Sequence, residues 1–348
     1  MSENKPDLKL QDLGESKIIE LIEQIIFEKT GEQIKIDDAF FIDLNIQKES
    51  PHTQIVLNTD MLISTFDAPP QMSSYQIGYK SIVMNVSDLL VKGITPIAVI
   101  ISLGLPNSLL IKKFRDIIEG IAEACKFFDM SYIGGDLNEI EKEIIINPTV
   151  IGFVQKEAII FRKGMKVGDV LCVNGNFGLT GVGFNILLNQ IGNETNPKYK
   201  KAIDSVLNPT VQAIEGKLLA ENNLATSSID SSDGLAKSLK DLSIANENLG
   251  FEVDFHQIPV NEVVKDYSEN YNVPLHKLLF NGGEEFVHIF TINPKNLDKA
   301  IKLIADNKGS LIPIGRVIAE NEIFIIKDNE REILQEFGYE HFLTTRKK

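Results

Sequence analysis

The chain has 348 residues, of which 43% are hydrophobic and 24% charged, and its formal net charge is −14. Two domains are expected, because this length exceeds one typical hydrophobic core. The composition excludes a disordered chain, and the excess of negative charge argues against a nucleic acid or an anionic membrane as partner.

The sequence also indicates the compartment. Cys125 and Cys172 lie far apart in apolar surroundings, so we expect buried thiols rather than a disulfide or a metal site. The N-terminus is polar and lacks the apolar core of a signal peptide. The longest apolar runs, 97–103 and 144–154, are short or interrupted by Pro148, so neither could span a bilayer. We therefore expect a cytoplasmic protein with no membrane partner.

Hydrophobic periodicity predicts the elements of the first half in chain order. An amphipathic helix is expected over 16–29 and a strand over 33–44. The stretch 55–93 combines a short apolar strand with a helix that ends at Gly93. It is followed by a strand over 97–103, a helix over 109–128 and a strand over 143–154.

A polar join near Phe161 separates the two halves, so we expect domains over 1–160 and 161–348. The second half is predicted to contain a strand over 170–173, a helix through Gln190, helices after Pro209 and Gly234, a strand or strand pair over 279–292 and a helix over 297–305. This alternation of strands and helices predicts an α/β or α+β fold.

The stretch 55–93 carries two carboxylates, each at the edge of an element that is otherwise apolar. Asp60 follows the strand, and Asp88 shares a polar stripe of the helix with Ser81 and Asn85. Taken alone, these residues fit a turn and a solvated helix surface as well as a functional site.

Five short motifs place carboxylates beside small residues at the ends of apolar elements, and none contains Lys or Arg. They are Asp37-Asp38-Ala39, Thr59-Asp60, Ser87-Asp88-Leu89, Gly134-Gly135-Asp136 and Asp230-Ser231-Ser232-Asp233-Gly234. Gathered carboxylates repel one another unless cations neutralise them, and Mg²⁺ takes carboxylate and phosphate oxygens. The motifs therefore favour a metal-bound nucleotide over scattered helix caps, although capping by Ser231 to Asp233 stays open.

Other sequence templates do not fit. The chain has no Walker A motif, and the glycines of 175–183 lack the dinucleotide-binding spacing. The five histidines show no metal-ligand spacing. A phosphoryl-transfer site built on carboxylates and Mg²⁺ remains the favoured interpretation.

In this order, the motifs resemble those of the thiamine-monophosphate kinase family, archaeal type, within the aminoimidazole-ribonucleotide (AIR) synthase-related superfamily. The likeness extends from Asp37 to Phe342. Ser232-Asp233-Gly234-Leu235 together with Gly282-Gly283-Glu284 is its most specific part, and the run 65–72 is similar to the archaeal branch.

The resemblance implies an α/β (α+β), two-domain AIR synthase-related fold. The N-terminal domain would hold magnesium and dimerise through its sheet, and the C-terminal α/β domain would close over nucleotide and substrate. The implied reaction is direct in-line transfer of a phosphoryl group from ATP to thiamine monophosphate, assisted by several Mg²⁺ ions, in a homodimer.

The resemblance also implies the roles of individual residues and no catalytic group beyond them. Magnesium would be held by Asp38, Thr59, Asp60, Asp88, Asp136, Asp230 and Asp233. ATP would contact Gly135, Asp136, Arg162 and Ser232, with Arg162 reaching phosphate. The thiamine moiety would meet Asp67, Glu284 and Tyr339.

Three departures from the family pattern keep alternatives open. Ile36 stands where the family usually has Gly, Asp67 where it often has His, and Glu285-Phe286 where it has Asp-Tyr. The alternatives are another ATP-using member of the superfamily and a non-catalytic nucleotide-binding paralogue. A hydrogenase-maturation dehydratase or a selenophosphate synthetase would need a terminal cysteine that this sequence lacks. A diguanylate cyclase shares only the run 282–286, without the acidic helix that should precede it.

Overall fold

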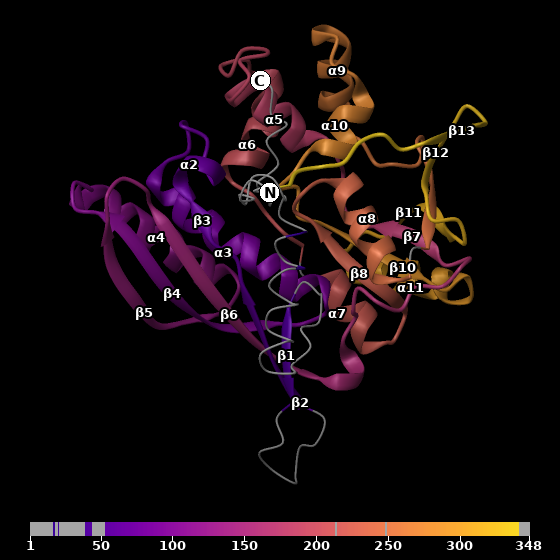
Figure 1. Ribbon diagram of the computed structural model, residues 1–348, viewed down its shortest axis with the longest axis horizontal. Helices are drawn as coiled ribbons and strands as arrows, with labels where there is room; N and C mark the ends of the chain where they lie inside the picture. Colours follow the sequence, from indigo (N-terminus) through magenta and orange to yellow (C-terminus); the bar gives the residue numbers. More distant parts are fainter. Residues whose placement is uncertain are drawn as a thin grey trace, which may run out of the picture.

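The computed structural model describes residues 39–43, 53–212, 214–247 and 249–340, together with Lys17 and Glu20. Two sheets, each with its own helices, lie on opposite sides of the molecule, and helix α3 runs between them (Figure 1). The helix expected over 16–29 and the part of the expected strand before residue 39 lie outside the described residues. No helix in the described ranges has the length and apolar character needed to cross a membrane.

The first sheet has the strand order β1-β2-β6-β4-β5, with β3 paired to β6. Its strands are β1 (Phe40–Asp43), β2 (Thr53–Thr59), β3 (Leu62–Ile63), β4 (Pro96–Pro106), β5 (Ser131–Ile140) and β6 (Ile145–Gln155). Only the pair β4–β5 is parallel among these described strands. The helices of this half are α2 (Ser64–Asp67), α3 (Ser74–Val91) and α4 (Ile111–Phe127).

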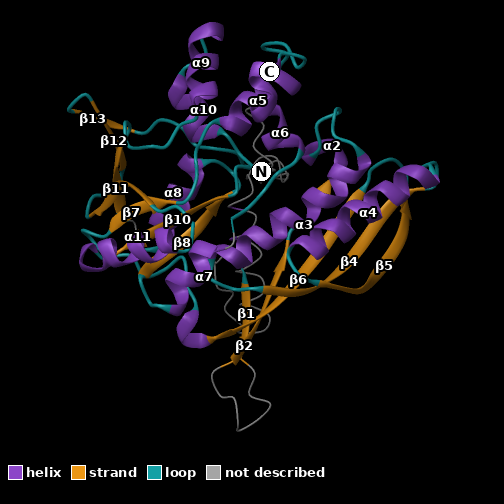
Figure 2. Ribbon diagram, turned by 180° about the vertical axis from the view of Figure 1, so that it is seen from behind, coloured by secondary structure: helices purple, strands orange, loops and turns teal. Residues whose placement is uncertain are grey.

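Helices α3 and α4 cover one face of the first sheet, as Figure 2 shows. Residues alternate along the strands, so Val56, Val99 and Val150 are buried under these helices. The opposite face exposes apolar side chains, among them Ile100 (43% exposed) and Phe153 (47% exposed). This sheet is therefore covered on one face and open on the other.

Two glycines let α3 and α4 approach closely. A Cβ atom on Gly78 would collide with the carbonyl oxygen of Ile117, and one on Gly120 would collide with that of Tyr75. The backbones consequently meet without side chains between them, and this contact fixes where α3 lies on the sheet.

The second sheet has the order β13-β12-β9-β11-β7-β10-β8. Its strands are β7 (Val170–Val173), β8 (Ala225–Ser231), β9 (Gly250–Asp254), β10 (Val287–Ile292), β11 (Ile312–Ile318), β12 (Ile323–Lys327) and β13 (Glu330–Ile333). The α-helices are α5 (Leu179–Leu187), α6 (Lys200–Leu207), α7 (Ile214–Glu221), α8 (Leu235–Ala245), α9 (Glu262–Tyr271), α10 (Leu275–Asn281) and α11 (Leu297–Asp306). Short 3₁₀ helices cover Lys156–Ala158, Pro197–Tyr199 and Pro294–Asn296.

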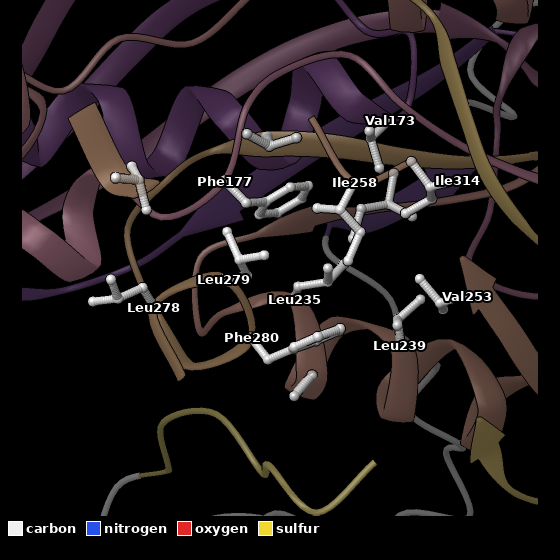
Figure 3. Packing of buried hydrophobic residues seen from close by; sticks show 14 of the residues in the cluster. Val173, Phe177, Leu235, Leu239, Val253, Ile258, Leu278, Leu279, Phe280 and Ile314 are labelled. Carbon is white, nitrogen blue, oxygen red and sulfur yellow. The ribbon is translucent and has the colours of Figure 1, made fainter. Parts of the chain in front are cut away.

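The core of the second half forms between this sheet and its helices. Phe177, Leu235, Leu239, Phe280 and Ile314 are fully buried there, and Figure 3 shows their side chains converging from several elements. Because α8 and α10 are anchored in this core, the loops that precede α8 and follow α10 have fixed starting points.

Helix α3 also packs against the second half. A Cβ atom on Gly216 of α7 would collide with the carbonyl oxygen of Leu90, so the two helices are in backbone contact. Ser81 and Asn85 of the predicted polar stripe are completely buried, and Asp88 is half-buried. The solvated-surface interpretation of this stripe is therefore wrong.

Two predicted elements differ from the structure. The strand expected over 279–292 is β10 only from Val287 onward, because the preceding residues end helix α10 and form an irregular loop. In that loop Glu284 and Phe286 have positive φ values of 59° and 49°. The motif Gly134-Gly135-Asp136 lies inside β5 rather than at the end of an element.

Candidate active site

The side chain of Asn85 fixes Asp60 at the end of β2. The backbone N–H of Asp60 donates to Asn85 Oδ1 (2.7 Å), and Asn85 Nδ2 donates to the carbonyl oxygen of Asp60 (2.9 Å). Asn85 is completely buried in α3. The backbone of Asp60 is therefore fixed at the end of β2, next to the middle of α3.

Asp88, one helical turn after Asn85, is held by the same strand. Asn58 Nδ2 donates to Asp88 Oδ2 (2.6 Å), and the Asn58 side chain points to the helix-covered face, where it is 4% exposed. Two consecutive turns of α3 thus bind Asn58 of β2 and Asp60 just after it, which brings Asp60 and Asp88 to one end of the strand.

Asp230 reaches the same region from the second half. Ser87 Oγ of α3 donates to Asp230 Oδ2 (2.7 Å), and Ser232 Oγ lies 3.3 Å from Asp230 Oδ1. Ser87 is completely buried and Asp230 is 3% exposed. Since Ser87 precedes Asp88, the same turn of α3 binds a carboxylate of the second half and carries one of the first half.

The loop before α8 joins the remaining predicted residues of the second half. The N–H of Glu284 donates to the Ser232 carbonyl oxygen (2.5 Å), and the N–H of Tyr339 donates to that of Asp233 (3.0 Å). These four residues, Ser232, Asp233, Glu284 and Tyr339, therefore form one continuous edge of the site.

Lys80 of α3 links this edge to the first half, and sequence reasoning did not identify it. Its Nζ lies 2.5 Å from Glu284 Oε1 and also donates to the carbonyl oxygen of Asp67. The Asp67 carboxylate turns back to the start of α2, where Oδ2 accepts from the N–H of Ile63 (2.7 Å). Burial raises the pKa of Glu284, and the Lys80 ammonium opposes that rise.

A cavity of about 280 Å³ lies beside Glu284 and Glu285 and reaches to the loop that precedes α5. Glu285 Oε1 accepts from the N–H groups of Gly178 (2.6 Å) and Thr180 (3.4 Å) at the start of that helix. Burial raises the pKa of Glu285 to about 8, although these backbone donors favour the ionised form.

Thr59 and Asp136 lie on the open face of the first sheet. Thr59 Oγ1 donates to the carbonyl oxygen of Pro148 (2.9 Å), and Asn138 donates to Asp136 Oδ2 (2.9 Å). Strands β6 and β4 separate β2 from β5, so three strand spacings, ~14 Å, lie between these two residues. Asp136 and Asp60 therefore cannot share one ion within a single chain.

Gly135 has a structural role in β5. A Cβ atom there would collide with the carbonyl oxygen of Ile101 on the paired strand, so glycine is required by the close pairing of β4 and β5. This requirement is independent of the nucleotide contact that the sequence motif implied.

Arg162 lies near the far end of α8. Its carbonyl oxygen accepts from Asn246 Nδ2 (2.8 Å), and Asn246 follows the last turn of α8, whereas Asp233 precedes the first. The helix between them is ~16 Å long. The structure thus places the Arg162 backbone away from the Asp233 loop.

The atoms that Asp60, Asp88 and Asp230 could offer to a metal ion are carboxylate oxygens, which suits a hard cation such as Mg²⁺. Within the described ranges no three His, Cys, Asp or Glu side chains gather closely enough to hold an ion by themselves. Mg²⁺ commonly takes one or two carboxylates and completes its shell with water and phosphate, so this donor set fits it. Asp38, also predicted as a ligand, lies outside the described residues.

Two family models together match most of the chain. The model described as AIR synthase related protein, N-terminal domain, matches residues 36–154, and the corresponding C-terminal domain model matches 166–328.

Two archaeal proteins align over almost their full length. The thiamine-monophosphate kinase of Nitrosopumilus maritimus is 31% identical over 334 residues, which cover 96% of this chain and 100% of that protein. That of Pyrococcus horikoshii is 33% identical over 331 residues, which cover 94% and 96%.

Solved structures share the fold. The structure of AaThiL complexed with AMPPCP and TMP superposes with a TM-score of 0.82 at 25% identity, covering 97% of this chain and 100% of that one. The thiamine monophosphate kinase of Aquifex aeolicus gives a TM-score of 0.76 at 24% identity, covering 93% and 99%.

Proposed function

Because the chain belongs to the thiamine-monophosphate kinase family of the AIR synthase-related proteins, we propose that it transfers the γ-phosphoryl group of ATP to thiamine monophosphate. The products are ADP and thiamine diphosphate. The observation that carries this proposal is the likeness over the whole chain to relatives of that name and to AaThiL complexed with AMPPCP and TMP.

The chain's own residues serve mainly to position the two anionic substrates. The acceptor is a phosphate monoester whose second pKa is about 6, so it is already ionised at neutral pH and needs no general base. Asn85, Asn58 and Ser87 hold Asp60, Asp88 and Asp230 in fixed places around α3. This preorganisation aligns donor and acceptor without later rearrangement.

We propose that the family's several magnesium ions bind at Asp60, Asp88, Asp230 and Asp233, with Thr59 and Asp38 as further ligands. When bound, Mg²⁺ supplies the positive charge that offsets repulsion between the two phosphates. Asp136 would serve a different ion or the nucleotide, because the sheet separates it from Asp60. Gly135, Arg162 and Ser232 remain proposed ATP contacts.

For the acceptor, Glu284 and Tyr339 are proposed to contact the thiamine moiety, because both bind backbone atoms of the loop that carries Asp233. Asp67 contributes through its carbonyl oxygen, which binds Lys80, since its carboxylate is engaged by Ile63. The cavity beside Glu284, at about 280 Å³, is near the lower end of the ~300–1,000 Å³ typical of small-molecule sites.

We also propose a cytoplasmic homodimer that pairs the open faces of the first sheet. Ile97, Ile100 and Phe153 are 40%, 43% and 47% exposed on that face. An exposed apolar patch of this kind on a sheet is typical of a protein interface. A second copy would bury these side chains. The N-terminal domain, residues 1–160, would then dimerise through its sheet, as the resemblance implies.

The proposed reaction is tested by mixing the purified chain with ATP, Mg²⁺ and thiamine monophosphate. Formation of ADP and thiamine diphosphate in equal amounts, abolished by excess EDTA, is expected. ATP binding without either product would instead favour a non-catalytic nucleotide-binding protein. ADP formation that does not depend on thiamine monophosphate would indicate another acceptor.

A further inference from the structure

Lys80 is a completely buried ammonium group in the middle of α3. Burying a charge is costly unless a partner of opposite charge and hydrogen bonds compensate for it. A neutral side chain of similar length would pack here at lower cost, so the presence of lysine calls for an explanation beyond stability.

The two partners of Lys80 are residues of the proposed acceptor site. Its Nζ lies 2.5 Å from Glu284 Oε1, and it also donates to the carbonyl oxygen of Asp67. Glu284 belongs to the second half of the chain and Asp67 to the first. Lys80 therefore positions both sides of the acceptor site from one point.

The ion pair uses only one oxygen of Glu284. Oε2 is buried and has no hydrogen-bond partner among the described residues, and Glu284 lines the cavity. The residue also has φ of 59°, a conformation that costs a non-glycine residue energy and that persists mainly where function requires it. An acceptor oxygen without a partner in a strained loop beside a cavity indicates that a ligand completes it.

The charge of the pair limits what that ligand group is. Lys80 already neutralises the Glu284 carboxylate, so Glu284 has no net charge left for the positive thiazolium ring of thiamine. What remains at Oε2 is the capacity to accept a hydrogen bond. The aminopyrimidine ring of thiamine carries an amino group that donates one.

We propose that Glu284 Oε2 recognises the amino group of the acceptor's pyrimidine ring, and that Lys80 is a positioning residue that keeps Glu284 oriented as a pure hydrogen-bond acceptor. This inference rests on the proposed function and names the part of the substrate that the site reads. In this assignment Glu284 does not pair with the positive charge of the thiazolium ring. Without Lys80, burial favours the protonated carboxyl group, which donates as well as accepts.

The test compares thiamine monophosphate with oxythiamine monophosphate, in which an oxo group that can only accept replaces the amino group. We expect the wild-type chain to prefer the amino compound by at least ~30-fold in kcat/KM, because the oxo group would face a carboxylate oxygen. For Lys80→Met we expect this preference to fall below ~3-fold, with KM for ATP unchanged within about a factor of two.

A matched control is available at the C-terminal cap of the same helix. Lys92 is also completely buried and also crosses to the second half, where its Nζ donates to the carbonyl oxygen of Ser228 (2.7 Å). Lys92→Met removes a buried ammonium without touching Glu284. We expect it to lower the melting temperature but to leave the preference for the amino compound as in the wild type.

Lys80→Met leaves the Glu284 carboxylate unpaired and could prevent folding, so the double variant Lys80→Met/Glu284→Gln is made in parallel. It contains no unpaired charge, and the Gln amide both donates and accepts, so it too should lose the preference. A wild-type preference near 1, or a wild-type preference retained in either variant, would overturn the inference. Absence of turnover with thiamine monophosphate itself would instead overturn the proposed function.

Discussion

Three polar side chains that touch no substrate define the carboxylate geometry of the site. Asn85, Asn58 and Ser87 are each nearly or completely buried, and each binds one of the aspartates. Supporting hydrogen bonds of this kind typically contribute 10–100-fold to metal affinity or activity. The aspartates are therefore only part of the site.

Asp88→Asn tests the ligand role directly. Losing one negative charge that offsets a bound cation should lower kcat by about 100-fold or more, because several kcal/mol of charge stabilisation depend on it. Asn58→Ala should lower kcat less, by ~10-fold, because Asp88 remains but is no longer held. Steady-state kinetics at saturating ATP measures both, with Glu119→Gln on the exposed face of α4 as control. Full activity in Asp88→Asn would refute the ligand role.

Glu285 should make stability depend on pH. Its folded-state pKa of about 8 lies above the ordinary value of 4.5, so the folded protein retains a proton that the unfolded chain has released. Between these values the free energy of unfolding falls as pH rises. Glu285→Gln keeps the oxygen that accepts from Gly178 but cannot ionise.

We expect Glu285→Gln to be more stable than the wild type by ~4 kcal/mol at pH 8.5, and this difference to fall below ~1 kcal/mol near pH 5. Urea denaturation at pH 5, 6.5 and 8.5 measures it. Parallel pH dependence of the two proteins would show that Glu285 ionises normally in the folded state.

The sequence predicts a site that includes several aspartates, but it does not predict the residues that support them. Asp60, Asp88 and Asp230 are recognisable because each adjoins small residues at the edge of an apolar element. The role of Lys80 depends on a partner 204 positions away, and that of Glu285 on a helix start 107 positions away. Partners so far apart in the chain produce no short sequence motif, and a lone lysine in a helix usually lies on the surface.

At the scale of elements, the contact between α3 and α4 determines where the site residues of α3 lie on the sheet. Gly78→Ala would force a Cβ atom into the Ile117 carbonyl group, and the helices would have to separate. We expect a loss of ~2–3 kcal/mol in the free energy of unfolding. Glu119→Ala, on the exposed face of α4, should change it by less than ~0.5 kcal/mol. Equal stability of Gly78→Ala and the wild type would show that this contact is looser than described.

Long periodic elements were predicted well, and short irregular ones were not. The expected helix over 109–128 is α4 (Ile111–Phe127), and the expected strand over 97–103 lies within β4. The error over 279–292 has a physical cause. The apolar run before Gly282 ends a helix, and its hydrophobicity alone does not distinguish a short buried helix from a strand.

At the scale of the molecule, the predicted two-domain AIR synthase-related fold is confirmed by the two family models and by the solved structures.

The dimer remains a proposal. Ile100→Lys places a charge in the open face of the first sheet and should yield a monomer, because an unpaired lysine would be buried between two copies. Light scattering coupled to size-exclusion chromatography measures the mass. Ile244→Lys, at a residue 56% exposed on α8, should leave the mass unchanged. Monomeric wild type, or dimeric Ile100→Lys, would exclude this interface.

The buried lysines of α3 and its C-terminal cap have a consequence for biosynthesis. Lys80 and Lys92 bind partners that lie 204 and 136 positions later in the chain. At ~5–20 residues per second, a ribosome delivers Glu284 about 10–40 s after Lys80. During that interval Lys80 and Lys92 lack Glu284 and Ser228, the partners that the second half supplies. The first half should therefore reach its final packing only once the second half has been translated, and ribosome-stalled chains ending before residue 284 should be degraded readily by added protease.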